Sequence, residues 1–250
     1  MSAFAAGLRR HGWKTTIAPA YAGGMRADLC VTWGVRRRDQ HLRAMSEGAE
    51  ICVLERGYVG DRLHWSSVSF GGGLNGRALF RGPFSDGTRW GEHFAKYMQP
   101  WRQKPDGYVL VCGQVSGDCS LKGVDIDRWY ADTIAELRAA GHDVRFRPHP
   151  LQGKPAPRLL PPLAEDLAGA RYVVTFNSNS GVDAVLAGVP TVAQDEGSMV
   201  YSIAGHDRLA MPPTPYRTSW AHALAWCQWS REEMERGDCW EAVGMVRANA

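Results

Sequence analysis

The chain has 250 residues, of which 44% are hydrophobic and 22% are charged, so it can bury a core in one large or two small domains. No apolar run approaches membrane-span length and the first residues lack the apolar stretch of a signal peptide, so we expect a cytoplasmic protein without a membrane span. The net charge of +3 is compatible with an anionic ligand but does not demonstrate nucleic-acid binding.

The first hundred residues are typical of a small α/β unit. Their patterns predict, in chain order, a helix over 3–11, strands over 15–18 and 28–33, a helix over 36–47, a strand over 50–54 and a helix over 90–98. The segment 58–87 is rich in Gly, Ser and Arg, which favours a long, ligand-exposed loop region with short strands. Two prolines and a change of composition indicate a linker over 100–107.

The second part of the chain alternates buried apolar runs with helical patterns. We expect strands over 108–112, 143–147, 172–176 and 191–193, separated by helices over 127–140, 163–167 and 182–187. This order predicts a doubly wound parallel sheet. Terminal helices over 220–229 and 231–246 complete three predicted domains, 1–104, 105–215 and 216–250, the last packing back on the first.

The cysteines and tryptophans are more easily explained by packing than by chemistry. The six cysteines include no C-x-x-C pair, and Cys30, Cys52 and Cys112 lie in apolar strand-like runs, so we expect reduced, mostly buried thiols. Most of the ten tryptophans are expected in the core, with stacking on a sugar or base as the less frequent alternative.

A polar turn follows the predicted strand 172–176 and opens a helix. Its residues are Asn177, Ser178, Asn179, Ser180 and Gly181. If Ser180 caps the helix, free backbone N–H groups and the positive end of the helix dipole point out of the carboxyl edge of the sheet, which is a suitable place for an anion. Capping would explain one polar residue, whereas four occur in a row, so we favour a ligand site.

Two basic residues end the neighbouring predicted strand. Arg147 and His149 flank Pro148, and Pro150 follows, so the backbone around the imidazole is fixed. Both side chains could pair with a phosphate. The alternative is a loop histidine bonded to a nearby carbonyl group.

Two further strand ends carry weaker signals. Gly113 and Gln114 could let a phosphate approach the backbone or form a plain turn. Asp195 and Glu196 could hold sugar or ribose hydroxyls or belong to a solvated loop.

Two carboxylates of the first unit are candidates for a catalytic base. Glu55 ends a buried predicted strand and Asp61 follows in the next loop, and Glu55 is the preferred candidate. A structural Arg–Glu pair would explain the same residues.

Several common enzyme classes lack their motifs here. The polar turn 177–181 lacks the Gly-Lys pair of a phosphate-binding P-loop, no strand predicted above is followed by G-x-G-x-x-G, and the chain has no G-x-S-x-G elbow. The histidines lack metal-ligand spacing, and the Asp125-Ile126-Asp127 sequence matches a metal motif but is interpreted as a helix cap. We therefore expect no metal requirement.

The motifs above resemble those of GT-B glycosyltransferases. The segment VVTFNSNSGVDAVLAGVPTVA is similar to the donor-binding strand and helix of that class, and is closest to the capsule-polysaccharide, Kdo-transferase-like families. The resemblance implies two Rossmann-like units facing a cleft, C-terminal helices crossing back, and a nucleotide-sugar donor, with a UDP-sugar expected first. It implies that His149 with Pro150, and Ser178 with Ser180, grip the donor phosphates, and that Glu55 and Gly57 lie on the acceptor side.

Compact enzymes of this kind are also familiar from bacteriophages, and this resemblance makes hydroxymethylpyrimidine DNA the leading expected acceptor. Arginines of the first unit could contact its phosphates: Arg36, Arg37, Arg38, Arg56, Arg62, Arg77 and Arg81. Solvated surface arginines would explain them equally. The alternatives are a capsule or lipopolysaccharide sugar acceptor, a non-catalytic nucleotide- or DNA-binding protein of this fold, and a sugar-nucleotide epimerase.

Overall fold

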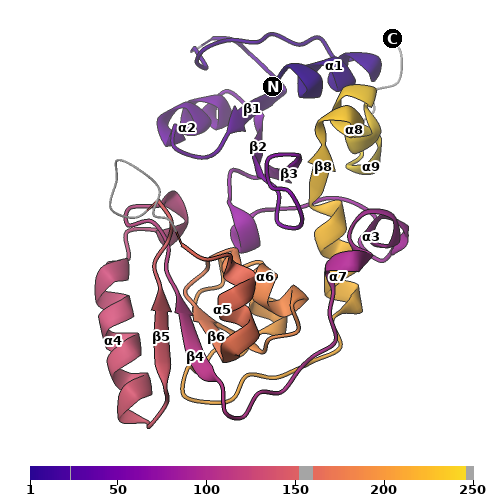
Figure 1. Ribbon diagram of the computed structural model, residues 1–250. Helices are drawn as coiled ribbons and strands as arrows, with labels where there is room; N and C mark the ends of the chain where they lie inside the picture. Colours follow the sequence, from indigo (N-terminus) through magenta and orange to yellow (C-terminus); the bar gives the residue numbers. More distant parts are fainter. Residues whose placement is uncertain (23, 152–159, 246–250) are drawn as a thin grey trace. The chain divides into compact units, whose positions relative to one another are not determined.

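The computed structural model describes residues 1–22, 24–151 and 160–245, and divides the chain into two compact units (Figure 1). Unit 1 comprises the described parts of Met1–Leu74, Ala78–Ala95 and Thr218–Ala250. Unit 2 comprises those of Asn75–Arg77 and Lys96–Arg217. Within the described residues, no helix is both long and apolar enough to span a membrane.

Unit 1 is built on a mixed four-stranded sheet in the order β1-β2-β3-β8. Its elements are α1 (Ser2–Arg10), β1 (Leu29–Trp33), α2 (Arg38–Ser46), β2 (Glu50–Arg56), β3 (Trp65–Phe70), α3 (Thr88–His93), α7 (Thr218–Trp226), β8 (Gln228–Ser230), α8 (Arg231–Arg236) and α9 (Asp238–Ala242). Only β1 and β2 are parallel, whereas β3 runs antiparallel to both β2 and β8. The expectation of two Rossmann-like units is therefore not met by unit 1.

The difference arises at β3, in a segment that the sequence analysis treated as loop with short strands. The connection 57–64 is too short for the crossover that a parallel neighbour needs, so the chain returns antiparallel. Ser67 and Ser69 are buried in this strand, and the Ser69 hydroxyl donates to the carbonyl oxygen of Val53 at 3.3 Å. The predicted strand 15–18 does not form, and Ile17 is 57% exposed.

The C-terminal part contains a strand that the helical pattern hid. Within the predicted helix 220–229, the helix α7 stops at Trp226 and β8 begins two residues later. The Gln228 side chain accepts hydrogen bonds from the backbone N–H groups of Tyr58 and Val59, which fixes β8 beside β3. Ser230 and Glu233 then form a capping box that starts α8.

Unit 2 contains a parallel sheet in the order β5-β4-β6-β7, as predicted. Its elements are β4 (Tyr108–Cys112), α4 (Ile126–Ala139), β5 (Val144–Arg147), α5 (Leu163–Gly169), β6 (Ala170–Thr175), α6 (Ser180–Leu186) and β7 (Thr191–Ala193). Asp125 caps α4 through a 3.0 Å bond from the Arg128 N–H, which confirms that interpretation of the Asp125–Asp127 sequence.

Apolar clusters cover both faces of this sheet. Val109, Val111 and Val174 pack with Tyr130 and Leu137 of α4, whereas Leu110 and Val173 face α5 and α6. Figure 1 shows α4 on one side of the strands and α5 and α6 on the other. All six cysteines are free thiols and all but Cys119 are buried, as predicted.

Candidate functional site

The four parallel strands of unit 2 end at one edge, and most of the predicted site residues lie there. Gly113 follows β4, His149 follows β5, Ser178 follows β6 and Asp195 follows β7. The chain leaves β4 toward α4 on one face and β6 toward α6 on the other, so the topological switch point lies between these two strands. Open α/β sheets bind ligands at such a point.

Gly113 lies directly against the turn that holds His149. Its N–H donates to the carbonyl oxygen of Arg147 at 2.8 Å, and a Cβ atom built on Gly113 would lie 3.0 Å from the backbone nitrogen of His149. Nδ1 of His149 accepts a bond from the N–H of Leu151 at 3.1 Å, so the neutral imidazole carries its proton on Nε2. The close approach explains why a glycine stands here.

Gln114 and Asn177 join the ends of β4 and β6. Gln114 Nε2 donates to Asn177 Oδ1 at 2.6 Å, and the backbone N–H of Asn177 donates to Gln114 Oε1 at 3.0 Å. Both side chains are buried, and the hydroxyl of Tyr130 bonds the backbone of Gln114. Gln114 is thus part of the frame of the edge.

The network continues to Asp195 after β7. Asn177 Nδ2 donates to Asp195 Oδ1 at 2.7 Å, and Arg77 NH1 donates to the same oxygen at 2.6 Å. Glu196 Oε1 accepts a hydrogen bond from Arg77 Nε at 3.0 Å. Burial alone would raise the pKa of Asp195, but bonds from Arg77, Asn177 and the Gly197 N–H hold it below its ordinary value. Asp195 and Glu196 are therefore committed to internal partners.

The turn after β6 does not have the expected cap by the Ser180 side chain. Asn179, not Ser180, occupies the N-cap position of α6, and no side-chain cap bond forms. The N–H of Ser178 donates to Thr175 Oγ1 at 3.0 Å, and that of Ser180 donates to Ser178 Oγ at 3.3 Å. The expected free backbone N–H groups at these two positions are thus already bonded, because the turn folds back on its own hydroxyls.

Two members of the turn face the interior. The Ser180 hydroxyl is buried and interacts with the thiol of Cys112. Burial raises the pKa of this thiol to about 12, and the interaction with Ser180 lowers it by a smaller amount. A Cβ on Gly181 would lie 3.1 Å from a methyl group of Val200, so the glycine allows α6 to pack closely. Ser178 remains the hydroxyl of the turn that is partly exposed and still has a proton to donate.

The three remaining charged candidates have structural partners. The guanidinium of Arg147 pairs with Asp166 and donates to the carbonyl oxygen of Pro161 at 2.8 Å. In unit 1, Glu55 Oε1 accepts a 2.9 Å bond from the N–H of Arg56, at the carboxyl end of β2. Asp61 Oδ1 accepts from the N–H of Leu63 and stabilises a turn.

Three of the arginines considered for DNA contacts are also engaged. Arg77 binds Asp195, Arg81 pairs with Glu50, and Arg62 Nε donates to the carbonyl oxygen of Gly57. Arg77 and Arg81 bond to residues 118 and 31 positions away, and Arg62 bonds to a backbone group 5 positions away. These bonds depend on the fold of the chain and have no signature in the local sequence. Arg36, Arg37, Arg38 and Arg56 are exposed.

No motif indicated the roles of three further residues that fix this edge: Arg77, Tyr130 of α4, and Thr175 at the end of β6. The only local signal was the polarity of Thr175 at the end of an apolar strand. In the described part of the chain, no group of three or more His, Cys, Asp or Glu side chains is arranged to hold a metal ion.

No protein-family model matches the sequence, and a search of curated proteins finds no match. Among solved structures, the chain is similar to the β-Kdo 2,7 transferase of KpsC from Thermosulfurimonas dismutans, with 15% identity, coverage of 84% of both chains and a TM-score of 0.47. It is also similar to the β-Kdo 2,4 transferase of the same KpsC, with 14% identity, coverage of 80% of both chains and a TM-score of 0.46.

A weaker similarity is to the glycotransferase of kitacinnamycin, with 15% identity, a TM-score of 0.27, and coverage of 62% of this chain and 45% of that chain. These neighbours are glycosyltransferases. Every one of these TM-scores is below 0.5.

Proposed function

We propose that the protein is a nucleotide-sugar-dependent glycosyltransferase whose donor binds at the carboxyl edge of the unit 2 sheet. The observation that carries this proposal is the switch point between β4 and β6, with His149 on one side and Ser178 on the other. Neighbouring strands lie about 4.8 Å apart, so the ends of β5 and β6 are about 10 Å apart, a span that suits a nucleoside diphosphate.

The proposed chemistry follows from the side chains. The Ser178 hydroxyl would donate to a phosphate oxygen, and His149 would stabilise charge on the departing diphosphate as the sugar–phosphate bond breaks. The shape of this edge, to which the donor would bind, would be set by Arg147, Asn179, Ser180 and Gly181. Its rigidity would come from Gln114, Asn177 and Asp195. Glu55 would accept the proton of the acceptor hydroxyl as the new glycosidic bond forms.

The proposed acceptor is a hydroxyl of a sugar, as in the capsule-type alternative. The internal partners of Arg62, Arg77 and Arg81 leave fewer cations for DNA phosphates than the sequence indicated. Hydroxymethylpyrimidine DNA is therefore retained as an acceptor to test, with no observation that favours it.

The test is to incubate the protein with UDP-, GDP- and CMP-sugars and with two acceptor sets, oligosaccharides and hydroxymethylpyrimidine DNA, and to detect products by mass spectrometry. We expect a hexose-type mass increase on an oligosaccharide, abolished by Glu55→Gln. A mass increase on DNA alone would overturn the proposed acceptor. Nucleotide binding without any product would favour a non-catalytic protein, and interconversion of the donor sugar without transfer would favour an epimerase.

A further inference from the structure

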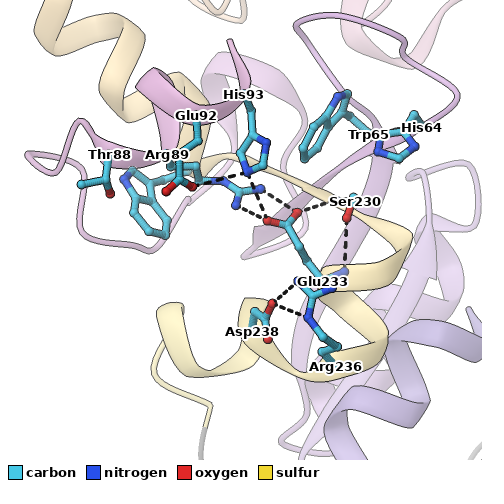
Figure 2. A pocket seen from close by; sticks show the side chains of 11 residues that line it. His64, Trp65, Thr88, Arg89, Glu92, His93, Ser230, Glu233, Arg236 and Asp238 are labelled. Carbon is cyan, nitrogen blue, oxygen red and sulfur yellow. Dashed lines mark hydrogen bonds and ion pairs between the residues drawn. The ribbon is translucent and has the colours of Figure 1, made fainter. Parts of the chain in front are cut away.

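Unit 1 contains a cavity of about 480 Å³ that none of the sequence motifs indicated. It is lined by residues at the start of β3, along α3 and around α8, among them Trp65, Glu92, His93 and Glu233 (Figure 2). Trp226, at the end of α7, also lines it. Cavities of this size accommodate small organic ligands. Because all the lining residues belong to unit 1, the cavity is independent of the donor edge in unit 2.

The floor of the cavity is a closed ion pair. Arg89 forms a bidentate pair with Glu233, and it also donates to the carbonyl oxygens of Gln228 at 2.7 Å and Ala225 at 2.9 Å. The two side chains are only 6% and 10% exposed. These bonds fix the floor and leave Arg89 no charge to offer to an incoming anion.

His93 stands above this pair with its imidazole in the cavity wall. Its Nε2 lies 3.9 Å from a carboxylate oxygen of Glu233 and 3.8 Å from one of Glu92, and Figure 2 shows it directed at Glu233. Both of these distances are longer than a hydrogen bond. The ring contacts Trp65 edge-on, with centroids 5.3 Å apart. His93 is therefore held by packing while its polar atoms are available to a ligand.

The charges of the lining residues select the kind of ligand. Two guanidinium groups, those of Arg89 and Arg236, are each paired with a carboxylate, Glu233 and Asp238, and Glu92 adds a further negative charge. A phosphate would meet more carboxylates than free cations. The indoles of Trp65 and Trp226 supply apolar surface beside these hydrogen-bonding groups.

We propose that this cavity binds a neutral pyranose ring, whose apolar face contacts the indoles while its hydroxyls bond to His93 and Glu92. The strand register supports a role near Glu55. Arg56 pairs with Ser66, and Trp65 pairs with Ser230, so the cavity lies at the same edge of the unit 1 sheet as the carboxyl end of β2. A sugar acceptor is one ligand of this class, but binding requires no donor.

The test is saturation-transfer NMR on the full chain with methyl β-glucopyranoside as the neutral probe and glucose 6-phosphate as the anionic probe. We expect transfer to the neutral glycoside, weakened about five- to tenfold in affinity by Glu92→Ala and by His93→Ala, because each substitution removes one hydrogen-bonding side chain. Glu235→Ala removes a carboxylate from α8, outside the cavity lining, and should leave binding unchanged.

The inference is overturned if the neutral glycoside shows no transfer, if both cavity variants bind it as the parent does, or if the phosphorylated sugar binds more tightly. UDP added to the same samples separates this result from the proposed function. Binding of UDP without the glycoside would overturn the cavity assignment alone, and binding of the glycoside without any nucleotide would overturn the donor site alone.

Discussion

Gln114 and Asn177 exchange two hydrogen bonds across the carboxyl edge of the unit 2 sheet, one through the Gln114 amide and one through the Asn177 backbone. The two residues end strands that are neighbours in the sheet but are separated by 63 positions in the chain. Through Asn177 the connection extends to Asp195 and Arg77, so the ends of β4, β6 and β7 are joined. A rigid edge of this kind can hold Ser178 and His149 at a constant spacing.

Removal of the Asn177 amide should weaken unit 2. Asn177→Ala leaves buried groups of Gln114 and Asp195 without their partner, and should cost about 1–3 kcal/mol in the free energy of unfolding. Asn177→Asp should cost more at neutral pH, because it places a second carboxylate beside Asp195. Urea unfolding, with hydrogen exchange of the β4 and β6 amides, measures both effects; equal stability of all three proteins would contradict the role of the network.

Gly113 should be sensitive to the smallest enlargement. A Cβ there would approach backbone atoms of Arg147, Pro148 and His149 to 3.0–3.2 Å, so Gly113→Ala must displace this turn by a few tenths of an ångström. We expect a severalfold loss of nucleotide affinity with a loss of stability of about 1 kcal/mol. Calorimetric titration with UDP checks this.

Gly91→Ala is the matched control, because a Cβ at Gly91 of α3 meets no atom within 4 Å. This variant should bind UDP as the parent does. If Gly113→Ala also binds UDP with unchanged affinity, the turn that carries His149 has no part in the site.

Removing one partner of the ion pair between Arg89 and Glu233 should destabilise unit 1 more than removing both partners. Arg89→Met leaves a buried carboxylate without its cation and should destabilise unit 1 by about 3–5 kcal/mol. The double variant Arg89→Met with Glu233→Met should recover part of that loss, even though it also removes the capping box. Hydrogen exchange of the Val68 amide, which bonds to Cys227, reports on unit 1, and a double variant less stable than Arg89→Met would contradict this account.

The same pair predicts the acid sensitivity of unit 1. Burial would raise the pKa of Glu233, but bonds from Arg89 and Ser230 hold it below its ordinary value of about 4.3. A carboxylate with a lowered folded-state pKa stabilises the fold above its unfolded pKa, and this contribution is lost as the pH falls. The contribution of Glu233 to the thermal unfolding temperature should therefore be constant near neutrality and be lost below about pH 4.3, so that Glu233→Gln shows a shallower decline in that range. Unchanged acid dependence in that variant would exclude Glu233 as a cause.

Unit 2 could be predicted from the sequence because its signals are local. Most of the strands are apolar runs such as Tyr108–Cys112, although β5 alternates apolar residues with arginines. Each strand is separated from the next by a helical pattern ended by glycine or proline. Gly188, for example, adopts φ +74° directly after α6. Local propensity and tertiary packing agree at these positions.

Unit 1 was less predictable because two of its strands depend on distant partners. The segment Trp65–Phe70 contains three serines, and its burial follows from pairing with β2 and with Gln228–Ser230 far along the chain. The strand Gln228–Ser230 follows α7 after a single residue, without a proline or glycine to mark the end of the helix. Neither pairing has a signature within its own window of sequence.

The candidate site shows the same division. The positions of Gly113, His149, Ser178 and Asp195 at strand ends follow from the strand order alone. Their partners do not, since Arg77 reaches Asp195 across 118 positions and was considered a phosphate contact. Arg89 and Glu233, which form the floor of the unit 1 cavity, are 144 positions apart.

The central claim is that a nucleotide binds at the carboxyl edge of the unit 2 sheet, and NMR titration of the labelled protein with UDP tests it most directly. We predict that the amide signals of Gly113, Gln114, His149 and Ser178 shift together, and that His149→Ala lowers the affinity by about 2–4 kcal/mol if the histidine contacts the phosphates. Signals that stay unchanged with UDP and with the other nucleotides, or shifts confined to residues away from this edge, would contradict the account.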